Sequence, residues 1–220
     1  DFYIAEDVSI ECATLNSTCG PIYIDKGATI MEGAHLRGPL YLGKGAVVKM
    51  GATIYGNVSV GRQSVIGGEV GNAVIGDFSA KGHHGYLGCS VIGDWCNLGA
   101  GTSNSNLKNN LKTVSIYDYK LDGFRDTRLL KCGIFMGDYT RTGINSSLNT
   151  GTVIGIASML ADTSFYAKFV PSFAWVFNGD TQNYDFEKFM EYVDTLYKSK
   201  NEELPERLKG ELNQLNKKYN

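Results

Sequence analysis

The chain has 220 residues, 27 of them glycine and only 4 proline, and its formal net charge is −2 at pH 7. This length allows a large core in one or two structural regions, and the small net charge argues against general electrostatic affinity for nucleic acid or anionic membranes. No apolar run approaches the roughly 18 residues that span a bilayer, and no secretory signal peptide is visible. The first residues, Asp1 to Ile4, contain no Met, as expected of a fragment or a processed product.

The cysteines indicate a reducing compartment. There are five, an odd number, and no two of them form a CxxC pair; they are Cys12, Cys19, Cys89, Cys96 and Cys132. Because a chain of this size does not need disulfides for stability, we expect reduced thiols and a cytoplasmic protein. A catalytic cysteine or a zinc site is the alternative, but a free cysteine is more often a small buried apolar residue.

An apolar residue recurs at every sixth position from residue 24 to residue 66. These positions are Ile24, Ile30, Leu36, Leu42, Val48, Ile54, Val60 and Ile66. Because six is even, side chains at this spacing share one face of an extended backbone, whereas an α-helix would spread them around its axis. A short fixed period is typical of repeat structures whose units stack on one another. The sequence therefore predicts a β-solenoid of hexapeptides, with eighteen residues in a three-sided coil.

Two interruptions break this repeat. After Ile66, the next inward residue followed by glycine is Ile75, nine residues on, and the segment KGHHGY at 81–86 is the most polar interruption. The hexapeptide pattern is then lost over residues 103–131, where an Asn-rich stretch predicts a long loop, and it returns over residues 136–160. We expect functional residues at such breaks in an otherwise consistent pattern.

The last part of the chain changes character. Residues 168–177 are aromatic and extended, and we expect them to cap the last coil, since an open coil exposes strand edges. Two apolar stripes at helical spacing follow and favour packing helices over a cofactor site: Phe186, Phe189, Met190, Val193, Leu196 and Tyr197, then Leu204, Leu208, Leu212 and Leu215. We therefore divide the chain into a solenoid at 1–165, with a loop at about 103–131, and a segment at 166–220 with an extended part and helices.

One histidine is a candidate for catalysis. A coil of eighteen residues places His83 next to Gly101, within the GAGT stretch at 99–102. A base beside backbone with little side-chain cover suits a site whose N–H groups bind a ligand carbonyl. The alternative is a turn histidine with a structural hydrogen bond. His84 is expected to point to another face, and His35 is expected to be exposed.

Other common sites are not indicated. Three histidines without a carboxylate cluster at ligand spacing do not suggest a catalytic metal. The glycine-rich signatures of dinucleotide and P-loop sites are also missing from the sequence.

Three motifs resemble a known family. They are KGHHGYLG at 81–88, VIGDWCNLGAGT at 91–102 and SNSNLKNN at 103–110. Together with the hexapeptides they resemble the acetyltransferase half of the bifunctional N-acetylglucosamine-1-phosphate uridyltransferase / glucosamine-1-phosphate N-acetyltransferase family. The segments at 130–155 and 168–175 resemble more closely the variant that is often called a sugar-nucleotidyltransferase, and the resemblance extends over residues 1 to about 178.

The resemblance implies a left-handed parallel β-helix and a homotrimer with sites in grooves between neighbouring solenoids. Together with the loop and the helices that the residue pattern predicts, the expected fold is an all-β solenoid, a left-handed parallel β-helix with an extruded loop and C-terminal helices. The cysteines predict a cytoplasmic protein, and charge and hydropathy predict no nucleic-acid or membrane partner. The implied reaction is transfer of the acetyl group of acetyl-CoA to the 2-amino group of glucosamine 1-phosphate, a step of UDP-N-acetylglucosamine biosynthesis. The family's nucleotidyltransferase domain, with its magnesium, is absent from this chain.

The resemblance also assigns site residues. His83, three residues before the tyrosine of Tyr-Leu-Gly, matches the catalytic histidine, and an imidazole with an ordinary pKa near 6.5 accepts the proton of an amine at neutral pH. The sugar-phosphate side comprises Tyr86, Asn97, Lys49 and Lys112, with Lys108 as an alternative to Lys112. The acetyl-CoA side comprises Ala100, Asn106, Leu107, Asp138 and Ile156.

Two departures from the family pattern keep other functions open. Gly71 stands where the family has a phosphate-binding lysine, twelve residues before the catalytic histidine, and the family's upstream arginine has only Lys49 or Arg37 as replacements. A sugar phosphate needs cationic partners. The alternatives to the acetyltransferase are a non-catalytic trimerisation and regulatory module of a sugar-1-phosphate nucleotidyltransferase, and a transferase with a different acceptor sugar.

Overall fold

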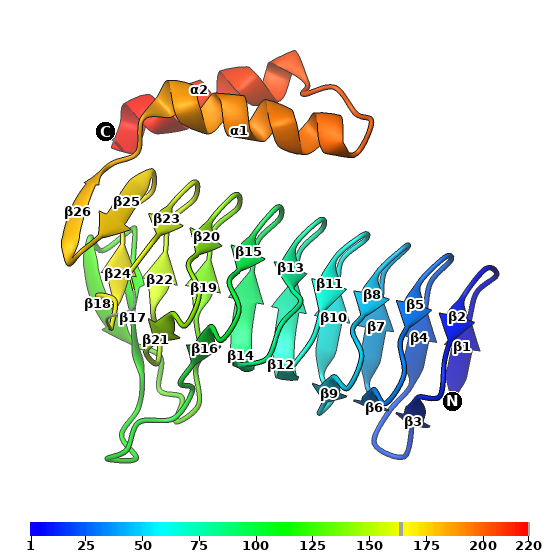
Figure 1. The fold of residues 1–220 in the computed structure, drawn as a ribbon. Helices are drawn as coiled ribbons and strands as arrows, with labels where there is room; N and C mark the ends of the chain where they lie inside the picture. The colour runs from blue at the N-terminus through cyan, green and yellow to red at the C-terminus, as the bar shows by residue number, and fades with distance from the viewer. Residues whose placement is uncertain (163–164, 220) are drawn as a thin grey trace.

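The computed structural model describes residues 1–162 and 165–219 and shows a parallel β-solenoid with two helices lying along one side (Figure 1). The coils advance from the N-terminus at one end to the strands β24 and β25 at the other. In the regular part, Thr29 pairs with Val47 and Val47 with Val65, so each coil has the predicted eighteen residues. The hexapeptide repeat therefore forms the predicted β-helix.

Short strands from successive coils form the faces of the solenoid. One sheet contains β1 (Phe2–Ile4), β4 (Ile22–Ile24), β7 (Leu40–Leu42), β10 (Val58–Val60), β12 (Glu69–Ile75), β14 (Tyr86–Ile92), β19 (Phe135–Met136), β22 (Val153–Ile154) and β24 (Phe169–Val170), with β3 (Thr14–Asn16), β6 (His35–Arg37) and β9 (Thr53–Ile54) joined to it through β12. The second contains β2 (Ser9–Ile10), β5 (Thr29–Ile30), β8 (Val47–Val48), β11 (Val65–Ile66), β13 (Ala80–Lys81), β15 (Asn97–Leu98), β20 (Arg141–Thr142), β23 (Met159–Leu160), β25 (Ala174–Phe177) and β26 (Asp180–Asn183). The pair β16 (Ser103–Asn104) and β21 (Ser147–Leu148) continues the third face.

The residues of the six-residue period form the core. All eight positions from Ile24 to Ile66 are buried, together with the small or apolar residues two positions before them, such as Ala28 and Ala46. Burial of one such Ile or Leu side chain stabilises a fold by about 1.5–3 kcal/mol. The core of this half therefore follows directly from the repeat.

The coils change length where the sequence pattern breaks. Val65 pairs with Ala80, fifteen residues later, and Ala80 pairs with Asn97, seventeen residues later. The next coil contains the extruded loop, so that Val91 pairs with Phe135, 44 residues later. This loop carries an antiparallel hairpin of β17 (Ser115–Asp118) and β18 (Gly123–Asp126), a pairing that the sequence did not predict.

Two helices pack on one corner of the later coils (Figure 1). They are α1 (Phe186–Ser199), capped at its N-terminus by the Asp185 carboxylate, and α2 (Glu206–Tyr219). Their apolar stripes form a second core with residues from five successive coils: Phe78, Trp95, Tyr139, Ala157 and Phe173. The fold class, including the loop and the helices, is therefore confirmed. Within the described ranges, neither helix has the length and apolarity needed to cross a membrane.

Candidate active site

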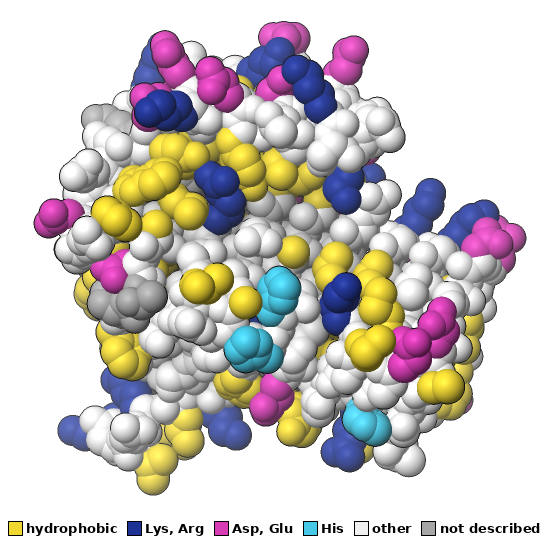
Figure 2. Space-filling model, in the orientation of Figure 1, with side chains coloured by type: hydrophobic (Ala, Val, Ile, Leu, Met, Phe, Trp, Pro, Cys, Tyr) yellow, Lys and Arg dark blue, Asp and Glu magenta, His cyan; other side chains and the backbone are white. Residues whose placement is uncertain are grey.

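The candidate base lies at one corner of the solenoid, which we call the His corner and define as residues 82–85 and 99–102. His83 and His84 are both exposed there, and a histidine pair is visible on the surface near the middle of the solenoid (Figure 2). The Gly101 N–H donates a hydrogen bond to the carbonyl of His84, with N and O 3.2 Å apart. Because this coil has seventeen residues and not eighteen, His83 lies at the level of Ala100, which corrects the expected pairing with Gly101.

The turn that carries His83 is longer than the turn on the preceding coil. Ile66 pairs with Lys81 and Glu69 pairs with Tyr86, so two residues (67 and 68) lie opposite four (82–85). The longer turn covers Gly68, where a Cβ atom would come within 2.7 Å of the His83 carbonyl oxygen. This close approach explains why glycine is required at that position.

A lysine behind this turn points into the solenoid. Lys81 is buried, and its Nζ donates to the carbonyls of Gly67 (3.0 Å) and His83 (2.5 Å). Burial lowers the pKa of its ammonium group to about 8. This residue was not predicted from the sequence, although Ile75, Lys81 and Leu87 follow one another at six-residue steps and so share the inward phase.

Asn106 lies at a second corner, which we call the Asn corner and define as Cys89, Asn106 and Cys132. There it contacts Tyr86, although the resemblance assigns Tyr86 to the sugar and Asn106 to acetyl-CoA. Asn106 Nδ2 donates to the Tyr86 hydroxyl (2.9 Å) and to Cys89 Sγ (3.3 Å). Burial is the main cause that raises the pKa of Tyr86. Gly88 makes this contact possible, because a Cβ there would lie 2.1 Å from the Tyr86 hydroxyl oxygen.

Two further side chains on this face were missed. Glu69 pairs with Tyr86 on the neighbouring strand, and both side chains point away from the core. The Glu69 charge also contributes to the raised pKa of Tyr86. Tyr55 occupies the space over Gly71, where a Cβ would meet the Tyr55 Cβ at 3.2 Å. Glu69 could have been predicted from the sequence by counting back from Tyr86 the seventeen residues of this coil.

Other predicted sugar-side residues lie farther along the solenoid or in the loop. Asn97 is exposed on β15, where it pairs with Ala80 on one side and Arg141 on the other. Lys49 is exposed on the coil before Gly67, whose Cβ would lie 3.2 Å from the Lys49 Cβ. Lys112 is exposed in the extruded loop.

The residues predicted for acetyl-CoA are divided among three corners. Ala100 lies in the His corner, Asn106 in the Asn corner and Leu107 beside it, bridged to Lys131 at the base of the loop. Within one chain these residues do not form a single continuous site. The sequence predicts sites in grooves between neighbouring solenoids, so the assignment of these residues to acetyl-CoA stays a prediction.

The third corner, which we call the Asp corner, contains Asp77, Asp94 and Asp138. Asp138 Oδ1 accepts from the Asp94 N–H (2.9 Å), and Asp94 Oδ1 accepts from the Asp77 N–H (2.7 Å). Burial is the main cause that raises the pKa of Asp94. Ile156 packs nearby against the apolar cluster of the two helices. Asp138 thus links two neighbouring coils, and Ile156 links its coil to the helices. Neither residue belongs to the His corner.

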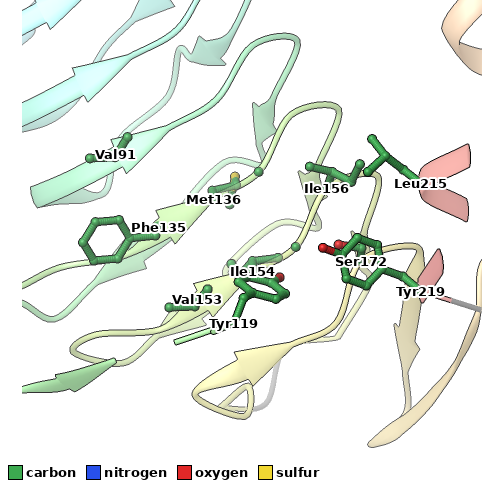
Figure 3. A pocket seen from close by; sticks show the side chains of 12 residues that line it. Val91, Tyr119, Phe135, Met136, Val153, Ile154, Ile156, Ser172, Leu215 and Tyr219 are labelled. Carbon is green, nitrogen blue, oxygen red and sulfur yellow. The ribbon is translucent and has the colours of Figure 1, made fainter. Parts of the chain in front are cut away.

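An apolar pocket lies elsewhere, between the outer face of the solenoid, the extruded hairpin and α2 (Figure 3). Its volume is about 350 Å³, and it is lined by Val91, Tyr119, Phe135, Met136, Gly137, Val153, Ile154, Gly155, Ile156, Ser172, Leu215 and Tyr219. Of the predicted site residues it includes only Ile156. None of the lining residues is charged, so this pocket does not suit a sugar phosphate.

Comparison with known proteins identifies relatives. No protein-family model matches the chain. The bifunctional protein GlmU of Methanocaldococcus jannaschii is 30% identical over 98 residues, which cover 44% of this chain and 23% of the relative. A bifunctional sugar-1-phosphate nucleotidylyltransferase/acetyltransferase of Sulfurisphaera tokodaii is 39% identical over 88 residues, which cover 40% of this chain and 21% of the relative.

Similar solved structures include two transferases. The polysialic-acid-specific acetyltransferase NeuO has a TM-score of 0.43 and 15% identity, with 89% of this chain and 97% of that one covered. An Arabidopsis UDP-N-acetylglucosamine acyltransferase has a TM-score of 0.31 and 14% identity, with 87% and 73% covered. At these TM-scores we infer nothing from either structure.

The relatives found by sequence show which proteins this chain is related to. The match spans only about a quarter of their length, and their activities are therefore properties of larger proteins. The resemblance expected from the motifs is confirmed: over roughly two fifths of its length, this chain is a homologue of the GlmU-type bifunctional proteins.

Proposed function

We propose that this chain is an acyltransferase that uses acetyl-CoA to N-acetylate an amino-sugar phosphate, with glucosamine 1-phosphate as the acceptor. The observation that carries the proposal is the His corner, where the exposed His83 lies one coil away from the turn at Ala100. Two relatives support it, since both are bifunctional proteins and one of them is a nucleotidylyltransferase/acetyltransferase.

The proposed chemistry follows from these groups. The amine of the acceptor attacks the thioester carbon and forms the new C–N bond, the C–S bond of the thioester breaks, and CoA leaves as a thiolate that the protonated His83 or solvent then protonates. His83 accepts the proton that the amine loses, a role suited to an imidazole at neutral pH. The N–H groups of Gly99, Gly101 and Thr102 already donate to other groups of the chain, so the Ala100 N–H is the candidate donor to the oxyanion that forms on the thioester carbonyl.

Recognition of the acceptor is proposed to involve Tyr86, Asn97 and the cations Lys49 and Lys112. A phosphate requires such cationic partners. Lys49 belongs to the same corner as His83, two coils earlier, and it is exposed. Lys112 is carried by the loop and would reach a phosphate from there.

A homotrimer would account for the separation of the predicted acetyl-CoA residues. Ala100, Asn106 and Asp138 occupy three different corners of one chain, whereas corners of neighbouring solenoids can face one another in a trimer. We place the protein in the cytoplasm, a proposal supported by its five free cysteines. Light scattering is expected to give three times the chain mass of 24.0 kDa.

One observation favours a second function. Gly71 is covered by Tyr55 and leaves no cationic group at that point of the sugar-side face. A non-catalytic module that trimerises and regulates a sugar-1-phosphate nucleotidyltransferase would not need such a group. It would also release no CoA.

A thiol-release assay separates these functions. The protein is mixed with acetyl-CoA and glucosamine 1-phosphate, or with unphosphorylated glucosamine, and free CoA is measured with a thiol reagent. We expect CoA release with the sugar phosphate, a loss of about 10²–10⁴-fold in His83→Ala, and little change in His84→Ala, the matched control in the same turn. Absence of CoA release by the unaltered protein, or full activity in His83→Ala, would refute the proposal.

A further inference from the structure

Lys81 occupies a position that the rest of the solenoid fills with apolar side chains. It pairs with Ile66 on the preceding coil, and its neighbour Ala80 pairs with Asn97, which places Leu98 opposite Lys81 on the next coil. Ile66 is fully buried, and Lys81 and Leu98 are each only 2% exposed. The lysine side chain therefore replaces one member of an inward apolar column.

The ammonium group has no anionic partner among the ion pairs of the described residues. Its hydrogen bonds go to the carbonyls of Gly67 and His83. Burial of a charge without a counter-ion is unfavourable, and burial is the cause that lowers the pKa of this group. An Ile or Leu, as on the neighbouring coils, would satisfy the fold without this penalty.

The two carbonyls belong to the turns of unequal length at the His corner. The Gly67 carbonyl lies in the shorter turn and the His83 carbonyl in the longer one. A single Nζ at 3.0 Å and 2.5 Å from these oxygens joins the two turns from inside the solenoid. With its carbonyl held inward, His83 presents its side chain on the outside, where it is exposed.

We propose that Lys81 is a positioning residue: its buried ammonium group binds the Gly67 and His83 carbonyls and fixes the four-residue turn that presents the His83 imidazole. The inference rests on the proposed function only in the role given to His83. It assigns Lys81 no contact with substrate and no part in proton transfer.

The test compares Lys81→Met with Ile66→Met in the full chain. Both place the same unbranched apolar side chain in the same inward column on adjacent coils, but only the first removes the contacts to the turn. Hydrogen exchange of the peptides that contain residues 67–69 and 99–102, where the Glu69 and Gly101 N–H groups donate to carbonyls of the turn, is measured by mass spectrometry. We expect exchange about 10-fold faster in Lys81→Met and unchanged in Ile66→Met.

Kinetics provide the second readout. In Lys81→Met, kcat per folded molecule should fall by about 100-fold with KM for acetyl-CoA unchanged, since misplacing a catalytic group by about 1 Å has effects of that size. Lys81→Gln retains N–H donors without the charge and should recover part of both the protection and kcat. It also replaces the Met variant if the latter does not fold. A residue with only a structural role would change the melting temperature but not kcat per folded molecule.

The outcomes are distinguishable from those of the proposed function. If His83→Ala is inactive while Lys81→Met keeps wild-type kcat and exchange, the positioning role is refuted and the acetyltransferase stands. If the unaltered protein releases no CoA, the acetyltransferase fails, and the exchange rates at residues 67–69 and 99–102 still decide whether Lys81 holds the turn. Unchanged exchange in both Lys81 variants overturns the inference.

Discussion

The coils from Ile24 to Ile66 and the coils that follow them share one architecture but not one composition. The first group repeats every eighteen residues, and its inward positions hold apolar side chains except at Ser64, next to the first irregular coil. The second has coils of fifteen and seventeen residues and buries polar groups, such as Ser79, Lys81 and Asn104. A coil of regular length needs only apolar packing in its interior, whereas a coil of irregular length also needs hydrogen bonds for its buried polar groups. The difference separates the part that supplies stability from the part that supplies the candidate site.

The largest effect on stability is expected in the regular coils. Leu42 is fully buried on β7, and Leu42→Ala should lower the free energy of unfolding by about 2–5 kcal/mol, because it leaves a cavity between coils. Turnover of the folded protein should not change. Urea unfolding and kcat are measured together, with the exposed Lys44→Ala as the control. A Leu42 variant of normal stability but reduced kcat would remove the distinction between the two regions.

The next largest effect concerns pH and the irregular coils. The pKa of Lys81 is lowered from 10.5 to about 8 in the folded chain. Between about pH 8 and 10.5, the Lys81 side chain is therefore protonated in the unfolded chain but mostly neutral in the folded chain. Stability therefore rises with pH between about 8 and 10.5 by up to roughly 3 kcal/mol. Relative to Lys81→Met, the unaltered protein should gain this amount over that range in urea unfolding. A difference between the two proteins that does not vary with pH would contradict burial of the charged form.

The smallest expected effect concerns the hydrogen bond at the Asn corner, and it compares a polar contact of an irregular coil with one of a regular coil. Tyr86→Phe removes the acceptor of the 2.9 Å hydrogen bond from Asn106 and should lower the free energy of unfolding by about 1 kcal/mol. Tyr41→Phe, in the regular coils, loses only an exposed 3.5 Å contact to Asp25 and should change stability by less than about 0.5 kcal/mol. Urea unfolding of the two variants in parallel tests this, and equal losses would show that the irregular coil gains nothing from its polar contact.

The sequence was sufficient to predict a β-solenoid, because side chains six residues apart share one face of an extended backbone. The left hand of the solenoid was predicted only through the family resemblance. Coil length was predicted correctly only while the repeat was unbroken. His83 was placed in the right corner, but one residue out of register, since its coil has seventeen residues. Lys81, six residues after Ile75, could have been predicted as an inward residue from the pattern, but it was overlooked.

Other features of the candidate site depend on contacts between distant segments. The hydrogen bond from Asn106 to Tyr86 crosses between coils and requires a glycine at residue 88. Asp138 and Ile156 could not be assigned to a corner, because the loop before them has no repeat from which to count. A local periodicity contains no information about where a long excursion rejoins the solenoid.

The two terminal helices have a consequence for how the molecule unfolds. In a simple solenoid each coil contacts only its neighbours, so coils can be lost one at a time from an end. Here the helices pack against five successive coils, from Phe78 to Phe173, and connect coils that do not touch one another. We therefore expect this half to unfold as one cooperative unit, because loss of any one of these coils would also expose the apolar face of the helices.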